Sequence, residues 1–288
     1  MYVLGVLDRG ADRETLEAVV DRTVDRLSRE GRGGVVRYDA TIADGTPAAS
    51  ETLTFGGDVT YDLGADGDWM ASGTGLSVQD ALDQLAPTCE YAVVVGVPTL
   101  RYPSVLVGPE ADPAEDDEVL AAIETSADLE EARLASDLAE TEPYQTLESL
   151  VSRVKRSPKA ALSGAIATFT GRVRTKDDPE DTPTEFLEFE KYEGVAEERM
   201  AALEADLEAR DGVLEVELYH RTGVVERGED IVFVVVLAGH RTVAFRTVED
   251  GINRLKDEVP LFKKEVTVED EFWVHERTEY LDSSSDRL

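Results

Sequence analysis

Strand-like and helix-like segments alternate along this chain in two runs, and an acidic stretch separates the runs. In the first run, an apolar segment at 2–7 precedes an amphipathic segment at 13–30 and a second apolar segment at 35–38. This order indicates a βαβ unit, because apolar residues recur at the helical period only in the middle segment.

The second run begins with an amphipathic segment at 147–154 and continues with strands that alternate or are fully apolar. Its hairpin-like order predicts an α+β domain. A length of 288 residues suits two domains. We therefore expect an α/β domain at 1–108, an acidic linker at 109–142 and an α+β domain at 143–288.

The turn after the first strand is similar to a phosphate-binding P-loop, but its chemistry is incomplete. Gly5 and Gly10 have the glycine spacing of that motif, whereas Ala11 and Asp12 replace its lysine and hydroxyl residue. Without the lysine that holds the phosphates, the first domain is predicted to be P-loop-like and degenerate. Nucleotide binding there remains an open alternative.

Acidic residues outnumber basic ones by 62 to 29, which gives a net charge of −33 spread over both domains. So negative a surface opposes binding to nucleic acid and to anionic membranes. The composition is typical of a protein from a high-salt cytoplasm. With no signal-like N-terminus and no apolar run of about 20 residues, we expect a soluble, cytoplasmic protein.

Lysine is rare in this chain, yet three of its seven lysines lie within nine residues, at Lys256, Lys263 and Lys264. A local cluster of cations in an acidic chain is a candidate site for an anionic ligand. Because adjacent residues of an extended segment face opposite sides, only one of the last two is expected to face a given pocket. The alternatives are a dipole interaction for Lys256 at a helix end and plain surface charge for the other two.

Two further segments supply cations. Arg172 and Arg174 share one side of a predicted strand, and His240 and Arg241 precede a predicted helix whose free N–H groups favour anions. We predict that these pairs and the lysine cluster form one anion-binding and catalytic site. Local salt bridges for the arginines and helix capping by His240 are the alternatives.

The chain offers little for metal chemistry. Its one cysteine, Cys89, precedes an apolar segment, and its three histidines are scattered. We predict no metal site and no cofactor.

Five ordered motifs resemble the MoaE family, the catalytic large subunit of molybdopterin synthase. They are GAIATFTGRVR, FLEFEKYEGVAEERM, ELYHRTGVVERGED, AGHRTVAFRTVEDGINRLKDEVPLFKKE and FWVHER. Phe262 departs from the family, in which tryptophan is common. The resemblance covers about 143–277 and implies an α/β hammerhead fold for the second domain. The first domain resembles, more weakly, MobB, a GTP-binding protein of the same cofactor pathway.

The MoaE resemblance implies a sulfurtransferase that acts on cyclic pyranopterin monophosphate. Two sulfurs would arrive as the thiocarboxylate of a MoaD-like, ubiquitin-fold carrier with a C-terminal Gly-Gly, which this chain lacks, and a homodimer within a heterotetramer is implied. The implied catalytic residues are Lys256 and Lys263. The implied substrate-binding residues are Arg172, Val173, Arg174, His240, Arg241, Lys264, Glu265 and Arg277.

Two other functions are compatible with the same residues. The cationic segments could form a noncatalytic module that docks a ubiquitin-like protein or is modified by one on its lysines. The first domain could instead act as a nucleotide-dependent adaptor for guanylation of the molybdenum cofactor. Turnover of the pterin and titration with GTP, respectively, separate these alternatives from the synthase.

The charge predicts a salt requirement. At molar salt the Debye length is about 3 Å, so repulsion between surface carboxylates is largely screened. We expect a higher melting temperature in molar KCl than at low salt, measured by thermal unfolding of the same sample. Equal melting temperatures in both buffers would contradict this.

Overall fold

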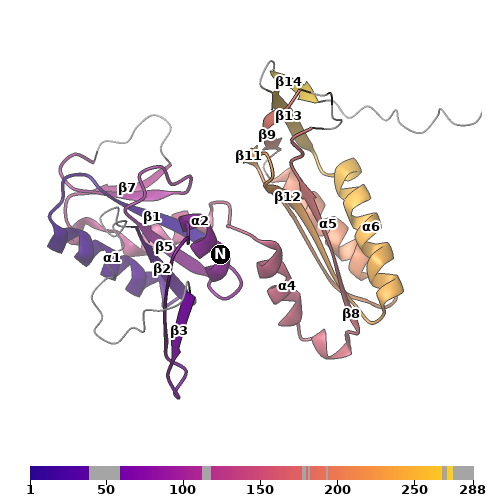
Figure 1. Cartoon of the computed structure of the whole chain (residues 1–288), viewed down its shortest axis with the longest axis horizontal. Helices are drawn as coiled ribbons and strands as arrows, with labels where there is room; N and C mark the ends of the chain where they lie inside the picture. Colours follow the sequence, from indigo (N-terminus) through magenta and orange to yellow (C-terminus); the bar gives the residue numbers. More distant parts are fainter. Residues whose placement is uncertain are drawn as a thin grey trace, which may run out of the picture. The chain divides into compact units, whose positions relative to one another are not determined.

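A computed structural model describes residues 1–38, 59–111, 118–176, 180, 182–192, 194–267 and 271–274. The chain divides into two compact units, Met1–Ser149 and Leu150–Leu288, whose elements are labelled in Figure 1.

The first unit contains a parallel five-stranded sheet in the order β2-β5-β1-β6-β7. Its strands are β1 (Tyr2–Asp8), β2 (Gly33–Arg37), β5 (Tyr91–Val95), β6 (Ser104–Val107) and β7 (Val119–Ile123). A helix lies between β1 and β2 and another between β2 and β5, as parallel crossovers often require. This confirms the α/β class and the βαβ start predicted from the sequence.

Helices cover both faces of this sheet. The unit's α-helices are α1 (Arg13–Leu27), α2 (Val78–Leu85) and α3 (Glu131–Ala139). Helices α1 and α3 share a core with Leu4 and Val6 of β1, whereas α2 packs in a second core with Val3 of the same strand. Burial on both sides explains why these strands read as continuous apolar runs.

A separate antiparallel hairpin consists of β3 (Val59–Leu63) and β4 (Trp69–Gly73). Residues 39–58, which precede this hairpin, lie outside the described residues.

The acidic stretch at 109–142 differs from the expected connector, because much of it belongs to the first unit. It contributes β7, the 3-10 helix η2 (Ser126–Asp128) and α3. Leu129, Leu134 and Leu138 are buried in the same core as α1. The many acids hide this apolar stripe when the segment is judged by composition.

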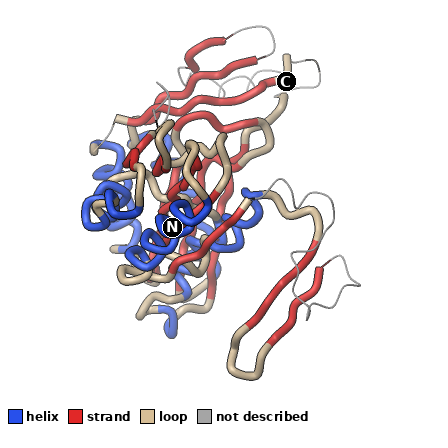
Figure 2. Tube along the Cα trace, turned by 90° about the vertical axis from the view of Figure 1, so that its left-hand side faces the viewer, coloured by secondary structure: helices blue, strands red, loops and turns tan. Residues whose placement is uncertain are grey.

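The second unit contains two antiparallel sheets, as the α+β class predicts. The first has the order β10-β12-β8 and the second the order β11-β9-β13-β14. Figure 2 distinguishes the strands from the helices. The strands are β8 (Ala165–Arg172), β9 (Thr184–Lys191), β10 (Val213–His220), β11 (Gly223–Glu226), β12 (Asp230–Ala238), β13 (Leu261–Thr267) and β14 (Glu271–Val274).

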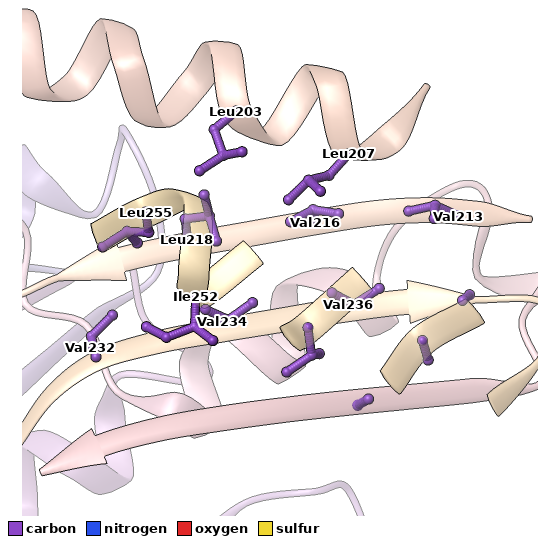
Figure 3. Packing of buried hydrophobic residues seen from close by; sticks show 14 of the residues in the cluster. Leu203, Leu207, Val213, Val216, Leu218, Val232, Val234, Val236, Ile252 and Leu255 are labelled. Carbon is purple, nitrogen blue, oxygen red and sulfur yellow. The ribbon is translucent and has the colours of Figure 1, made fainter. Parts of the chain in front are cut away.

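Two helices, α5 (Val195–Glu208) and α6 (Arg241–Glu258), share a core with the three-stranded sheet. Figure 3 shows Leu203 and Leu207 of α5 above Val216 of β10 in this core. The unit also has η3 (Ala160–Leu162), and α4 (Leu147–Lys155) spans the boundary between the units.

The buried stripe of α6 leaves out one of its large apolar residues. Val248, Ile252 and Leu255 are buried, but Phe245 is 65% exposed. The buried stripe passes through Ala244 instead, which is one residue, or about 100° of helix rotation, away.

The placement of α3 can be tested with Leu138→Ala. Leu138 is fully buried, so the substitution should lower the free energy of unfolding by about 2–5 kcal/mol. The measurement is chemical denaturation in molar KCl. The control is Leu76→Ala, because Leu76 is 61% exposed in the same unit. An equally small loss of unfolding free energy in both variants would indicate that residues 109–142 are a solvated connector.

Candidate functional site

The second unit contains a cavity of about 420 Å³. Side chains from both antiparallel sheets and from the end of α6 line it. The apolar lining residues are Phe169, Leu187, Phe189, Ile231, Val232, Leu255, Leu261 and Phe262, and the polar ones are Arg172, Arg174, Thr184, His220, Lys256, Lys263 and Glu265.

Arg172 and Arg174 both face the cavity, as their predicted alternation requires. Val173 between them is buried against Leu187 and Phe189 and anchors the strand end; it is not among the residues that line the cavity. Its backbone N–H donates to the Glu229 carbonyl at 3.0 Å.

Arg172 also takes part in the local salt bridge that the sequence left open. Its Nε lies 3.0 Å from Asp230 Oδ1, and it donates to the Gly228 carbonyl. These contacts hold Arg172 at the rim and offset part of its charge. Its guanidinium is therefore a positioned cation with some N–H groups already engaged.

Lys256 and Lys263 line the cavity from opposite sides of the turn between α6 and β13. Lys256 is in the last turn of α6, which ends before Val259 and Pro260. The lysine pair on β13 separates as period two predicts: Lys263 lines the cavity, whereas Lys264 Nζ is 3.9 Å from Glu188 Oε2. Two catalytic candidates therefore share one cavity.

Glu265 lines the cavity two residues beyond Lys263. Its carboxylate accepts a hydrogen bond from the hydroxyl of Thr184, whose side chain is buried. This contact fixes the position of one carboxylate oxygen.

His240 and Arg241 lie at the N-terminal end of α6, far from this cavity. Fifteen residues of helix separate Arg241 from Lys256, which is about 22 Å along the axis. His240 occupies the N-cap position without a side-chain capping hydrogen bond. The structure thus joins two of the three predicted cationic segments within one chain. Arg277 lies outside the described residues.

His220, which the sequence analysis did not single out as a site residue, also lines the cavity. Burial lowers its pKa to about 4, against a weaker opposing effect of the hydrogen bond to the Arg221 backbone. The residue ends β10, and its β12 neighbour Val232 is in turn paired with Gly171 of β8. No local signal reveals this placement, because it depends on pairing between strands far apart in the chain.

The turn that resembles a P-loop is occupied by the chain's own carboxylates. Asp8 Oδ1 accepts from the Ala11 N–H at 2.8 Å, and Asp12 Oδ1 accepts from the Thr15 N–H at 2.7 Å. The backbone N–H of Thr15 holds the pKa of Asp12 below its ordinary value. The start of α1 therefore presents negative charge where a phosphate would need N–H donors.

Neither a metal cluster nor a membrane span is found in the part of the chain that the structure describes. No group of three or more His, Cys, Asp or Glu side chains there could hold a metal ion. No helix there is both long and apolar enough to cross a bilayer.

Fold and cavity together define a chain with an α/β unit and an α+β unit that carries a cationic cavity. Residues 139–258 match the family model described as MoaE protein. A probable molybdopterin synthase of Haloferax volcanii is 49% identical over 278 residues, covering 96% of this chain and 100% of the relative. The molybdopterin synthase catalytic subunit of Yersinia pestis is 38% identical, covering 40% of this chain and 74% of the relative. This chain belongs to the MoaE family.

Among solved structures, a MobB protein homolog from Bacillus stearothermophilus matches with a TM-score of 0.36 and 20% identity. The match covers 49% of this chain and 100% of that protein. The α/β class of the first unit follows from its own parallel sheet and the helices on both faces of that sheet.

We expect no saturable binding of magnesium GTP to the full chain. The Asp12 carboxylate occupies an N–H at the start of α1 and would repel a phosphate. Isothermal titration calorimetry in molar KCl measures this, with Asp12→Ser as a variant that keeps a capping oxygen without charge. Saturable heat from the unsubstituted chain would contradict the expectation.

Proposed function

We propose that this chain is the catalytic subunit of a molybdopterin synthase and acts as a sulfurtransferase. It would transfer sulfur from the thiocarboxylate of a MoaD-like carrier to cyclic pyranopterin monophosphate. The observation that carries this proposal is the meeting of Arg172, Arg174, Lys256 and Lys263 around one cavity.

The charge of the cavity suits both reactants. A cyclic phosphate and a thiocarboxylate are anions, and arginine can hold an oxyanion with two parallel N–H groups. In molar salt the screening length is about 3 Å, so only cations in direct contact with the ligand attract it strongly. Four cations lining one cavity meet this requirement in a chain with a net charge of −33.

The apolar part of the cavity suits a flat heterocycle. Phe169, Leu187 and Phe189 contribute to its lining, and aromatic side chains favour stacked or edge contacts with ring systems. A volume of about 420 Å³ lies in the range usual for small-molecule sites. A pterin with one phosphate combines these apolar and anionic parts.

The chemistry requires two stages for each sulfur. The thiocarboxylate sulfur first attacks an oxygen-bearing carbon of the pterin side chain. The carbon–oxygen bond breaks, its oxygen leaves with the opened phosphate ring or as water, and carrier and substrate are joined through an acyl–sulfur bond. Water must then cleave that bond, so that sulfur stays on the pterin and the carrier leaves as a carboxylate. In this proposal Lys256 and Lys263, which line the cavity, polarise the acyl oxygen and supply protons.

The carrier is a separate partner in this proposal, which agrees with relatives named as a catalytic subunit. His240 and Arg241 keep their predicted substrate contacts only if a second copy brings them to this cavity. The proposed homodimer within a heterotetramer provides such a copy, and the proposed location is the cytoplasm.

Lys256→Ala should slow formation of the dithiolene by about 10²–10⁴-fold, because a proton donor is lost. Carrier binding should persist. Lys263→Ala should weaken turnover as well, whereas Lys264→Ala should change it little, because Lys264 lies beside Glu188. The assay is product formation from cyclic pyranopterin monophosphate and thiocarboxylated carrier in molar KCl.

The adjacent lysines make this a matched comparison of two alanine substitutions on one strand. Near-normal turnover of the Lys256 variant, or equal losses at 263 and 264, would defeat the assignment of the cavity as the reaction site.

A further inference from the structure

His220 is a cavity residue whose ring is fixed on one side. Its Nδ1 lies 2.8 Å from the Arg221 carbonyl oxygen. Its ring meets Phe189 edge to face, with centroids 4.8 Å apart and planes at 73°. Two independent contacts therefore set the orientation of the imidazole at the cavity wall.

The contact with Arg221 determines which nitrogen carries the proton in the neutral ring. A carbonyl oxygen only accepts, so Nδ1 must donate. The other nitrogen, Nε2, is then an acceptor with a free lone pair. Within the described residues it has no hydrogen-bond partner in the protein.

The surroundings keep this ring neutral. Burial holds its pKa near 4, so the neutral form dominates above about pH 5. Arg172, Arg174, Lys256 and Lys263 are the cations that line the same cavity. Arg221 on the adjoining turn pairs with Glu229 at 3.5 Å.

Among the polar groups that line the cavity, acceptors are few. Arginine and lysine side chains in their charged forms only donate. Glu265 and Thr184 can accept, but they are joined to each other by a hydrogen bond. His220 therefore presents an uncharged acceptor that no other lining side chain of the cavity occupies.

The second stage of the sulfur transfer proposed above needs such a group, because water attacks a carbonyl faster once a base removes its proton. Resting on that proposed function, we infer that His220 Nε2 is the general base that activates the water cleaving the acyl–sulfur bond. The proton of water moves to Nε2, and the oxygen bonds to the acyl carbon. The carbon–sulfur bond then breaks and its electron pair stays on sulfur.

The balance of this step needs no further reactant. The carrier leaves as a carboxylic acid and ionises, the pterin keeps a thiolate, and the imidazolium returns its proton to solvent or to that thiolate. His220 is regenerated for the second sulfur. Lys256 and Lys263 supply the complementary charge on the acyl oxygen during the attack.

Two substitutions separate the anchor of the ring from its basic atom. His220→Asn keeps an N–H near the position of Nδ1 and removes Nε2. His220→Gln keeps an acceptor oxygen near the position of Nε2, but this oxygen is not basic. Tyr219→Phe is the matched control, because Tyr219 precedes His220 on β10, stacks on Phe233 and is not part of the cavity lining.

The experiment is a single turnover of each full-length variant with thiocarboxylated carrier and cyclic pyranopterin monophosphate in molar KCl. Intact-protein mass spectrometry of acid-quenched samples measures carrier joined to the pterin. Hydroxylamine, which cleaves acyl–sulfur bonds, identifies the linkage. Thermal unfolding and carrier binding show which variants are folded.

Both His220 variants should form the joined species at the normal rate and release the carrier about 10²–10⁴-fold more slowly. Release should recover as pH rises, because hydroxide replaces the missing base. Tyr219→Phe should behave as the unsubstituted chain does. If one His220 variant does not fold, the other still provides the test.

Other outcomes would overturn the inference. Carrier release at the normal rate by His220→Gln would show that His220 acts only as a hydrogen-bond acceptor. Loss of product without accumulation of carrier joined to pterin would show that His220 acts in binding or folding. In both cases turnover by the unsubstituted chain would leave the synthase proposal intact. Absence of any turnover by the unsubstituted chain would instead remove the proposed function itself.

Discussion

Several cations held around one apolar cavity are the arrangement on which the second unit depends. Like charges repel, so their positions must be imposed by packing and not by attraction among themselves. The buried stripe of α6 fixes Lys256 at the helix end, and the pairing of β13 with β9 fixes Lys263 opposite Phe189. The burial of Val173 likewise fixes the positions of Arg172 and Arg174, its two neighbours in the chain. An anionic ligand would relieve this repulsion, which is the physical basis of the affinity that we propose for it.

Donors and acceptors are unevenly distributed within this cavity. In the proposed reaction its cations would attract the phosphate and the sulfur-bearing tail and would polarise the acyl oxygen, but they cannot remove a proton while charged. The neutral ring of His220 complements them because its orientation leaves one nitrogen open. The first unit shows the opposite arrangement, since its helix terminus is already occupied by Asp12. The carboxylate of Asp12 thus occupies an N–H donor at the start of α1, whereas the cavity of the second unit is lined by cations.

Local sequence patterns predicted the structure well where only contacts between residues close in the chain mattered. The division of Lys263 from Lys264 followed from the period of two residues along a strand. Composition was a poorer guide at 109–142, where acids conceal the leucines that α3 buries. The exposure of Phe245 shows the same limit, because a helix with several apolar residues does not reveal which stripe its neighbours cover.

Outside 109–142, the sequence by itself indicated the strands and helices, the period of side chains along each of them, and the family motifs. These properties depend on backbone hydrogen bonds and side-chain periods within a few residues of chain. Only the tertiary structure decided which faces meet. It brought His220 to the cavity through the β10-β12-β8 register, and it left His240 at the far end of α6. The reason is that strand register is set by burial of a core shared by distant segments, which no local pattern encodes.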